Sequence, residues 1–337
     1  MADPLRVLLL GDTHLGFDDP LHARVDRRRR GADFLKNFEL ALEPALRGEV
    51  DAVVHGGDLF HRSSVPAALV ERAFRPIAKI GAAGVPVFIV PGNHERSRIP
   101  HPLFAVHRNV FVFDRPRTFP VPFAGGVAAF CGFPFAPDVR ARFGTLLDAT
   151  GHAQVQAAVR LLCVHQAIEG ARVGTPEFVF ARGPDVISGA DLPAGFAAVL
   201  GGHVHRGQRL ARALDGTALA APAFYAGSVE RTSFAERRET KGYLILRIRT
   251  GGGGHVERYD FLPLPARPMF RMTIEASCRD GSDPLYSLQQ RLAALPADAI
   301  VRVHVGGGAM PGVTAAILRE IAPAGMNVDL AWAAAAT

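Results

Sequence analysis

Five apolar stretches of this chain each end in a polar segment that contains Asp, Asn or His, and four of these segments also carry glycine. The polar segments are residues 11–14, 56–58, 91–95, 165 and 201–205. Short continuous apolar runs closed by Gly or Pro are typical of buried strands. Ligand sites of α/β folds gather at the carboxyl ends of strands. We therefore expect the five polar segments to converge on one place.

Strands and helices alternate along most of the chain. The spacing of apolar residues predicts helices over 33–46 and 65–80, the second with Pro66 in its first turn, where proline is tolerated. Strands are expected at Leu5–Leu10, Ala52–His55, 85–90, 110–113, 127–130, 161–164, 198–200 and 243–248. This alternation predicts a layered α/β domain, and the turn-rich stretch 211–243 favours a second, antiparallel-leaning sheet.

A proline-rich run over residues 262–268 is the candidate domain boundary. The glycines of 251–254 precede it and are expected at a hairpin turn between Ile248 and Val256. After the prolines the pattern starts again, with strands at 270–276, 300–305 and near Val328, and helices at 286–295 and 313–321. We expect a main domain over 1–262 and a small α/β domain over 263–337.

Charge and cysteine content narrow the function classes. The net charge is +6, which suits a polyanionic partner, and the run 27–30 is four arginines, either a solvated segment or a phosphate-contacting patch. Three separated cysteines argue against a disulfide scaffold and against a thiolate zinc site. No apolar run is long enough to span a bilayer, so we expect a soluble cytoplasmic protein without membrane contact.

The polar residues at the strand ends are of types that bind metal ions. Carboxylate, imidazole and amide oxygen together suit Mn²⁺, Fe²⁺ or Zn²⁺ rather than a soft-metal thiolate site. In an extended turn, side chains two residues apart point the same way, which applies to Asp12 with His14 and to His203 with His205. A shared carboxylate is the natural bridge between two ions, and Asp58 is the candidate. The predicted ligands are Asp12, His14, Asp58, Asn93, His165, His203 and His205.

Each of these pieces is weak evidence alone. A single Gly-Asp pair is more often a turn, a single histidine at a strand end is more often structural, and Asn93 could cap a helix. Five such segments in one chain are poorly explained by separate turns, structural histidines or helix caps. Together they indicate a metal site.

In this order, the segments resemble the signature of the calcineurin-like metallophosphoesterase superfamily. The resemblance covers about two thirds of the chain and implies a four-layer α/β/β/α sandwich of two mixed sheets. It implies that Asp58 bridges two divalent ions, which we expect to be Mn²⁺, with Fe²⁺, Zn²⁺ or Mg²⁺ as alternatives. One ion would take Asp12, His14 and His205, and the other would take Asn93, His165 and His203. His94 matches the family's histidine near the leaving oxygen.

A narrower resemblance points to DNA double-strand-break repair nucleases of the SbcD type. It rests on residues 55–61, on 12–16 followed by the arginine run, and on 225–231 with 241–243. In that family the histidine at the position of His61 is linked to exonuclease action. The start of the C-terminal segment is similar to the family's small DNA-capping domain.

This resemblance also implies partners. DNA is the expected one, with an SMC-like ATPase subunit and a second copy of the chain as further expectations. No helical pair of the kind that docks on the ATPase is evident after residue 268.

The expected function is Mn²⁺-dependent exonuclease and endonuclease action on DNA. His94 would act as general acid at the leaving oxygen, His61 would steer the DNA end, and Arg96 and Arg231 would contact the DNA backbone. For His94 the alternative is a turn histidine bonded to backbone, and for His61 a solvated turn histidine.

Two other functions stay open. One is a phosphoesterase acting on small nucleotides or phosphoproteins, although protein phosphatases of the superfamily carry Gly-Asp-x-Val-Asp-Arg-Gly where this chain has Leu59, Phe60 and His61. The other is a non-catalytic DNA-binding module.

Overall fold

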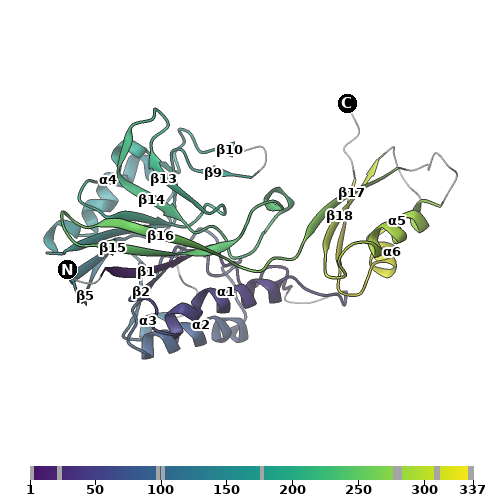
Figure 1. The fold of residues 1–337 in the computed structure, drawn as a ribbon, viewed down its shortest axis with the longest axis horizontal. Coiled ribbons are helices and arrows are strands. Elements are labelled where there is room, and N and C mark those ends of the chain that lie inside the picture. The colour runs from purple at the N-terminus through teal and green to yellow at the C-terminus, as the bar shows by residue number, and fades with distance from the viewer. Residues whose placement is uncertain are drawn as a thin grey trace. The chain divides into compact units, whose positions relative to one another are not determined.

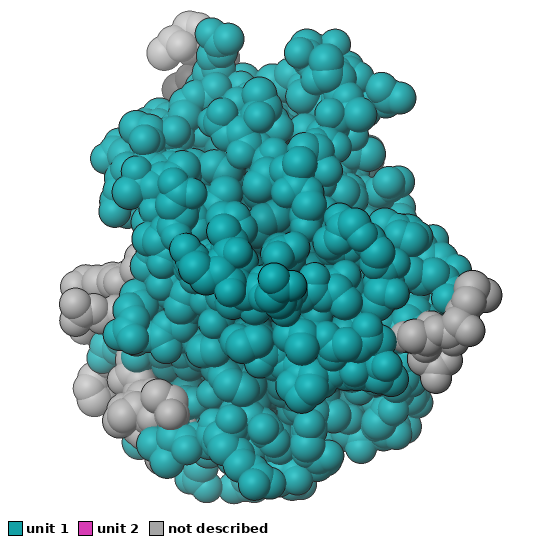
Figure 2. All heavy atoms as spheres, turned by 90° about the vertical axis from the view of Figure 1, so that its left-hand side faces the viewer, with its two compact units in different colours: residues 1–21, 31–265 teal, residues 22–30, 266–337 magenta. Residues whose placement is uncertain are grey.

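The computed structural model describes residues 4–20, 25–95, 99, 103–174, 178–275, 283–306 and 312–332. Contacts divide the chain into two compact units (Figure 1), residues 1–21 with 31–265 and residues 22–30 with 266–337. Figure 2 shows one face of the first unit as spheres. The assignment of separate nuclease and capping-like roles to 1–262 and 263–337 stays a prediction.

The first unit contains two six-stranded mixed sheets, as expected. The first sheet has the order β16-β15-β1-β2-β3-β4, and its strands are His255–Pro263, Gly242–Arg249, Leu5–Leu10, Ala52–His55, Val87–Ile89 and Val110–Val112. The second has the order β13-β14-β12-β7-β6-β5, with strands Gln208–Arg212, Ala218–Tyr225, Ala198–Gly201, Val159–Val164, Gly126–Gly132 and Arg117–Phe123. The predicted α/β class with two mixed sheets is confirmed.

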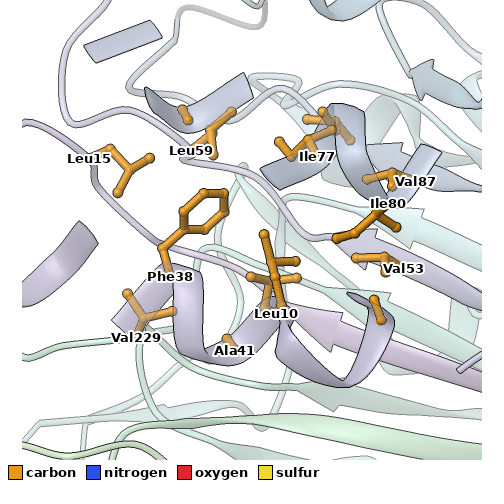
Figure 3. Close-up of a cluster of buried hydrophobic side chains, with 14 of the residues drawn as sticks. Leu10, Leu15, Phe38, Ala41, Val53, Leu59, Ile77, Ile80, Val87 and Val229 are labelled. Carbon is orange, nitrogen blue, oxygen red and sulfur yellow. The ribbon is translucent and has the colours of Figure 1, made fainter. Parts of the chain in front are cut away.

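Three hydrophobic clusters separate four layers of the first unit. Because side chains of a strand alternate between faces, β1 sends Leu8 and Leu10 to one cluster and Val7 and Leu9 to the next. The first cluster lies between the first sheet and helices α1 (Gly31–Leu46) and α2 (Ala67–Ala82), as Figure 3 shows. The second lies between the sheets, and the third packs α4 (Val139–Ala149) on the second sheet.

Parallel pairing brings the ends of the central strands to one edge. In the first sheet β1, β2 and β3 run parallel, with Leu10 beside His55 and His55 beside Ile89. In the second sheet β7, β12 and β14 run parallel, with Val164 beside Gly201 and Gly201 beside Tyr225. The predicted polar segments therefore leave neighbouring strands at equivalent positions.

The expectation of an antiparallel-leaning sheet over 211–243 is only partly correct. β13 and β14 form an antiparallel hairpin, but β14 runs parallel to β12 inside the mixed second sheet, and β15 joins the first sheet. The glycine hairpin between β15 and β16 is present as expected. The sequence reading missed β5, an edge strand that contains Pro120 and Pro122, because proline argues against a central strand. It also missed α4 and the short elements α3 (Leu103–Val106), β8 (Ala167–Ile168), β9 (Arg172–Val173), β10 (Phe178–Val179) and β11 (Val186–Ile187).

The second unit has a sheet of its own. Strands β17 (Met269–Glu275), β18 (Ile300–Gly306) and β19 (Asn327–Trp332) are all parallel, and helices α5 (Pro284–Ala293) and α6 (Ala315–Ile321) complete it. Its core contains Leu288, Leu292, Val301, Val303 and Leu318. The last residue of the expected strand 270–276 lies outside the described residues. Within the described ranges of the chain, no helix combines the length and apolar character that crossing a bilayer requires.

Candidate metal centre

The structure brings all seven predicted metal ligands together at the carboxyl edge of the two sheets. Asp12 and His14 follow β1, Asp58 follows β2, and Asn93 follows β3. His165 follows β7, and His203 and His205 follow β12. Asp12, His14, Asp58 and His165 are buried, whereas Asn93, His203 and His205 are partly exposed. Their role as ligands stays a prediction, but their proximity is a property of the fold.

One group of side chains contains Asp12, His14 and His205. His14 Nε2 lies 3.0 Å from His205 Nε2, and His205 Nε2 lies 3.9 Å from Asp12 Oδ1. The ligand atoms of the three residues lie within 4.8 Å of one another, close enough for one ion. This is the set, with Asp58, that the family resemblance assigns to the first ion.

A second group contains Asn93, His165 and His203. Asn93 Oδ1 lies 3.0 Å from His165 Nε2 and 3.1 Å from His203 Nδ1. Asp58 Oδ2 lies 3.4 Å from His165 Nε2 and 3.9 Å from His14 Nε2, so it reaches both groups. This position suits the predicted bridging carboxylate.

The donor set fits divalent metal ions. Asp12 Oδ2 is buried and has no hydrogen-bond partner among the described residues, which is costly for a carboxylate oxygen unless a cation meets it. Oxygen and imidazole nitrogen donors together suit borderline and hard divalent ions. The ligand atoms of Asp12, Asp58 and His165 also lie within 4.8 Å of one another, close enough for these three residues to bind one ion.

Burial and neighbouring charges shift the pKa values of these groups. Burial raises the pKa of Asp12, and it lowers the pKa of His14 and brings that of His203 to about 3, so both imidazoles are neutral, as ligation requires. Burial alone would raise the pKa of Asp58, but the adjacent His165 holds it below its ordinary value. In turn, Asp58 raises the pKa of His165 to about 9 against the effect of burial.

The backbone of the site is strained. Four of the six non-glycine residues with positive φ in the described ranges are predicted ligands, namely Asp12, His14, Asp58 and His203. Non-glycine residues rarely adopt such angles, which cost roughly 1–3 kcal/mol each and cluster at functional sites. Space is equally restricted, because a Cβ at Gly92 would collide with the Asp58 carboxylate and one at Gly57 with the His165 ring.

His165 and His205 are oriented by different kinds of partner. His165 Nδ1 donates to the Gly56 carbonyl at 2.8 Å. His205 Nδ1 lies 3.3 Å from Glu236 Oε1, and the Thr232 hydroxyl donates to the same carboxylate oxygen at 2.6 Å. A partner on the second ring nitrogen fixes the tautomer and leaves the other nitrogen for a metal.

The Glu236 cluster was missed by the sequence reading. Lys241 is buried, lies 2.7 Å from Glu236 Oε2 and donates to the His205 carbonyl at 2.7 Å. Hydrogen bonds from His205 and the charge of Lys241 overcome burial and lower the pKa of Glu236. Glu236 lies 31 residues after His205 in a 3-10 turn, η3 (Phe234–Glu236), and no local pattern in the sequence connects the two residues.

Two further buried polar side chains hold the loops. His55 Nδ1 accepts from the Gly57 N–H at 3.2 Å, which leaves Nε2 to donate to the Thr13 hydroxyl at 3.0 Å. Glu95 accepts from the N–H groups of Phe60 and Gly92, both at 2.9 Å. The Glu95 side chain is buried, and these two bonds link the Asp58 loop to the Asn93 loop.

The two predicted catalytic histidines lie beside the first group. His94 Nδ1 lies 2.8 Å from the His61 carbonyl, and its Nε2 lies 3.9 Å from Asp58 Oδ2, while 36% of the side chain is exposed. The ring centroids of His61 and His94 are 5.4 Å apart, and both rings lie within 6 Å of the His14 ring. Burial lowers the pKa of His61. The backbone bond foreseen in the alternative for His94 exists, but it leaves Nε2 directed at the site.

The arginines are placed less clearly at the site. Arg96 lies outside the described residues. Arg231 is only 5% exposed and donates to Glu230 Oε1 at 3.1 Å and to the Arg237 carbonyl at 3.2 Å, so its guanidinium is already engaged within the protein. In the run 27–30, Arg28 donates to the Gly325 carbonyl at 3.1 Å, and its own carbonyl accepts from Asn327 at 2.9 Å, both within the second unit. Their contacts with DNA remain predictions.

Comparison with known proteins agrees with this geometry. Residues 5–207 match the family described as calcineurin-like phosphoesterase, a superfamily of metal-using hydrolases of phosphoester bonds. The DNA double-strand break repair protein Mre11 of Haloferax volcanii is 31% identical over 305 residues, which cover 90% of this chain and 61% of that protein. The Mre11 protein of Methanosarcina acetivorans is 25% identical over 316 residues, covering 91% of this chain and 46% of that one.

The chain therefore spans between about half and three fifths of the length of these relatives. Among solved structures, a dimetal phosphatase from Danio rerio aligns with 77% of this chain and 100% of its own, at 14% identity and a TM-score of 0.43. A similarity that low assigns no activity.

Proposed function

The chain belongs to the calcineurin-like phosphoesterase family, and we propose that within it this protein is a DNA nuclease that works with two divalent metal ions. The observation that carries the proposal is the arrangement of seven predicted ligands in two groups that share the Asp58 carboxylate. The relatives named as DNA double-strand break repair proteins support DNA as the substrate.

Each group has the donors to hold one ion. Asp12, His14 and His205 would hold the first, Asn93, His165 and His203 the second, and Asp58 would contact both. When bound, two divalent ions supply Lewis acidity and lower the pKa of a water molecule toward neutrality. Mn²⁺ is proposed because the set combines hard oxygen and borderline imidazole donors, with Fe²⁺, Zn²⁺ or Mg²⁺ as the alternatives to be compared.

His94 is proposed as the general acid. The His61 carbonyl accepts the proton on His94 Nδ1, which fixes the ring with Nε2 facing the site. Because about a third of the His94 side chain is exposed, a bound phosphodiester can reach Nε2, and the doubly protonated ring would deliver its Nε2 proton to the leaving oxygen while keeping the Nδ1 proton.

His61 is proposed to position the DNA end. Its Nδ1 is buried and has no hydrogen-bond partner among the described residues, and Phe17 packs against the edge of the ring at 5.1 Å. A neutral imidazole held there can donate to or accept from a nucleotide without adding charge near the ions.

The arrangement of the predicted ligands alone does not distinguish DNA from a small nucleotide or a phosphoprotein as the substrate. Residues 59–61 lack the Val-Asp-Arg-Gly continuation typical of the superfamily's protein phosphatases, which favours DNA. Association with an SMC-like ATPase and pairing of two copies are part of the same proposal and rest on the family resemblance alone.

The test is cleavage of a labelled linear DNA duplex with added Mn²⁺, beside a small chromogenic phosphodiester and an Asp58→Ala control. The proposal predicts shortening of the duplex and hydrolysis of the small ester, both lost in the control. Hydrolysis of the small ester alone would exclude DNA as the substrate of this chain, and hydrolysis of neither would overturn the phosphodiesterase assignment.

The role of His94 has a separate test. His94→Gln should lower kcat by about 10²–10⁴-fold, the usual share of a general acid. Mn²⁺ affinity measured by calorimetry should stay within about twofold of wild type, since His94 is not among the predicted ligands. Near-normal kcat in this variant would show that His94 is a structural turn histidine.

A further inference from the structure

Two adjoining hollows lie on the first unit next to the metal centre. One of about 570 Å³ lies between β9 and β13, and one of about 330 Å³ reaches Phe261 of β16. Both are lined by Arg206 and Gly207, the two residues that directly follow His205. Together they form a groove, here called the β13 groove, that begins where the predicted ligands end.

The β13 groove is strongly basic. Arg172, Arg206, Arg209 and Arg212 line the larger hollow, and Arg238 lines the smaller one. Glu239 is the acidic residue among the described lining residues, and its carboxylate is already bound by Lys241 at 2.8 Å. The groove therefore presents excess positive charge to a ligand, which indicates a polyanion.

The walls of the groove are fixed by specific contacts. Gln208 accepts from the Arg172 N–H at 2.9 Å and donates to the Arg172 carbonyl at 2.8 Å, which ties β9 to the edge strand β13. A preorganised groove binds a ligand without a large cost of ordering its own chain.

Aromatic rings accompany the arginines. Tyr259 and Phe261 lie on β16, the edge strand of the other sheet, and are 41% and 36% exposed. The Arg209 guanidinium carbon lies 5.9 Å from the ring centroids of both Tyr259 and Phe224. The edges of the two sheets thus meet beside the groove and expose rings next to cationic groups.

We propose that the β13 groove binds a single strand of nucleic acid that extends from the metal centre. This inference rests on the proposed nuclease function. Arginines contact the phosphates, and the exposed rings stack on bases, which is the combination used for single strands because their bases are not hidden in a duplex. An acidic extended peptide is the other polyanion that could enter, but it has no use for the exposed rings.

The test measures binding of a fluorescent 20-nucleotide oligo-dT and of a blunt 20-base-pair duplex, in EDTA so that nothing is cleaved. The variant is Arg172→Gln with Arg209→Gln and Arg212→Gln. The matched control is Arg72→Gln with Arg75→Gln and Arg108→Gln, three exposed arginines elsewhere on the same unit. A second variant, Tyr259→Leu with Phe261→Leu, keeps apolar bulk but removes the stacking faces.

The groove variant should bind oligo-dT about 10- to 100-fold more weakly than the control variant at 0.1 M salt. The slope of log affinity against log salt concentration should fall in magnitude by about 2, because each of the three lost phosphate contacts contributes roughly 0.7 to it. The aromatic variant should lose about tenfold for oligo-dT and little for the duplex. Equal affinity in groove and control variants would overturn the proposal, as would an equal loss for duplex and single strand.

Polyglutamate added as competitor distinguishes the two polyanions. Displacement of oligo-dT by polyglutamate of equal charge, at equal concentration, would assign the groove to acidic peptides instead. Hydrolysis of the small chromogenic phosphodiester should be unchanged in the groove variant. If the wild type hydrolyses neither that ester nor the linear duplex with any divalent metal, the nuclease function fails, whatever the binding experiment shows.

Discussion

The two halves of the proposed metal centre hold their imidazole rings by different kinds of contact. The half with His165 is held by the backbone, since the Gly56 carbonyl fixes the ring and the adjacent glycines leave no room for a Cβ. The half with His205 is held by side chains, since Glu236, Thr232 and Lys241 orient that ring. The half that contains His165, here the backbone-held half, should be rigid and should not tolerate added atoms. The half that contains His205, the side-chain-held half, should bind metal more weakly when one of the orienting side chains is replaced.

The largest effect should come from the residue that belongs to both halves. Asp58→Asn removes a charged oxygen within 3.9 Å of His14 and 3.4 Å of His165. Metal ions contribute several kcal/mol of transition-state stabilisation, so phosphodiester hydrolysis should fall about 10⁴-fold or more. Steady-state rates over a range of Mn²⁺ concentrations measure this, and activity within tenfold of wild type would remove Asp58 from its bridging position.

The backbone-held half should respond sharply to one added methyl group. In Gly57→Ala the new Cβ would overlap the His165 ring, and the residue has a φ of 114°, which alanine rarely adopts. We expect hydrolysis to fall about 10²-fold and excess Mn²⁺ not to restore it, because the ligand itself is displaced. Gly84→Ala, also at positive φ but with open space around it, is the matched control and should keep full activity. Rescue of Gly57→Ala by excess Mn²⁺ would show that the half is more adaptable than its packing indicates.

The side-chain-held half should lose metal affinity gradually rather than completely. Glu236→Gln keeps the shape but removes the negative charge beside His205, and loss of such partners typically lowers metal affinity 10- to 100-fold. Raising the Mn²⁺ concentration should therefore restore the rate. Glu239→Gln is the control, because Glu239 also binds Lys241 but has no described contact with the His205 ring. Equal metal affinity in the two variants would break the distinction between the halves.

The smallest effect concerns Glu95, which links the Asp58 and Asn93 loops. In Glu95→Gln the side-chain NH₂ group faces one of the two buried backbone N–H donors and cannot accept its hydrogen bond. The variant should therefore lose about 1–3 kcal/mol of unfolding free energy at pH 6. Burial raises the pKa of Glu95 to about 7, above its ordinary value of 4.5, so its contribution to stability is full below pH 4.5 and is lost as the pH rises through about 7.

The stability difference between wild type and Glu95→Gln should thus narrow between pH 6 and pH 8. Urea unfolding of metal-free protein at several pH values measures it. Glu43→Gln, at an exposed position of α1, serves as the control. A difference that widens as the pH rises would contradict this account of Glu95.

The same contrast explains what the sequence could predict. The strand ends were predictable because apolar runs closed by glycine and a polar residue are local patterns, as at Leu10 with Asp12 or at His55 with Asp58. Glu236 was not, because its contact with His205 depends on how the chain returns after β14. β5 was missed because its prolines argue against a central strand, although an edge strand tolerates them. α4 was missed because its apolar spacing is weak and Gly144 interrupts it.

The number of ions bound tests the central claim most directly. Calorimetric titration of metal-free protein with Mn²⁺ should show two ions for each chain, with Asp58→Asn losing measurable affinity for both. Both results are expected because the carboxylate of Asp58 reaches both ligand groups. Fewer than two ions in the wild type, or two ions bound with unchanged affinity in Asp58→Asn, would contradict a shared two-metal centre.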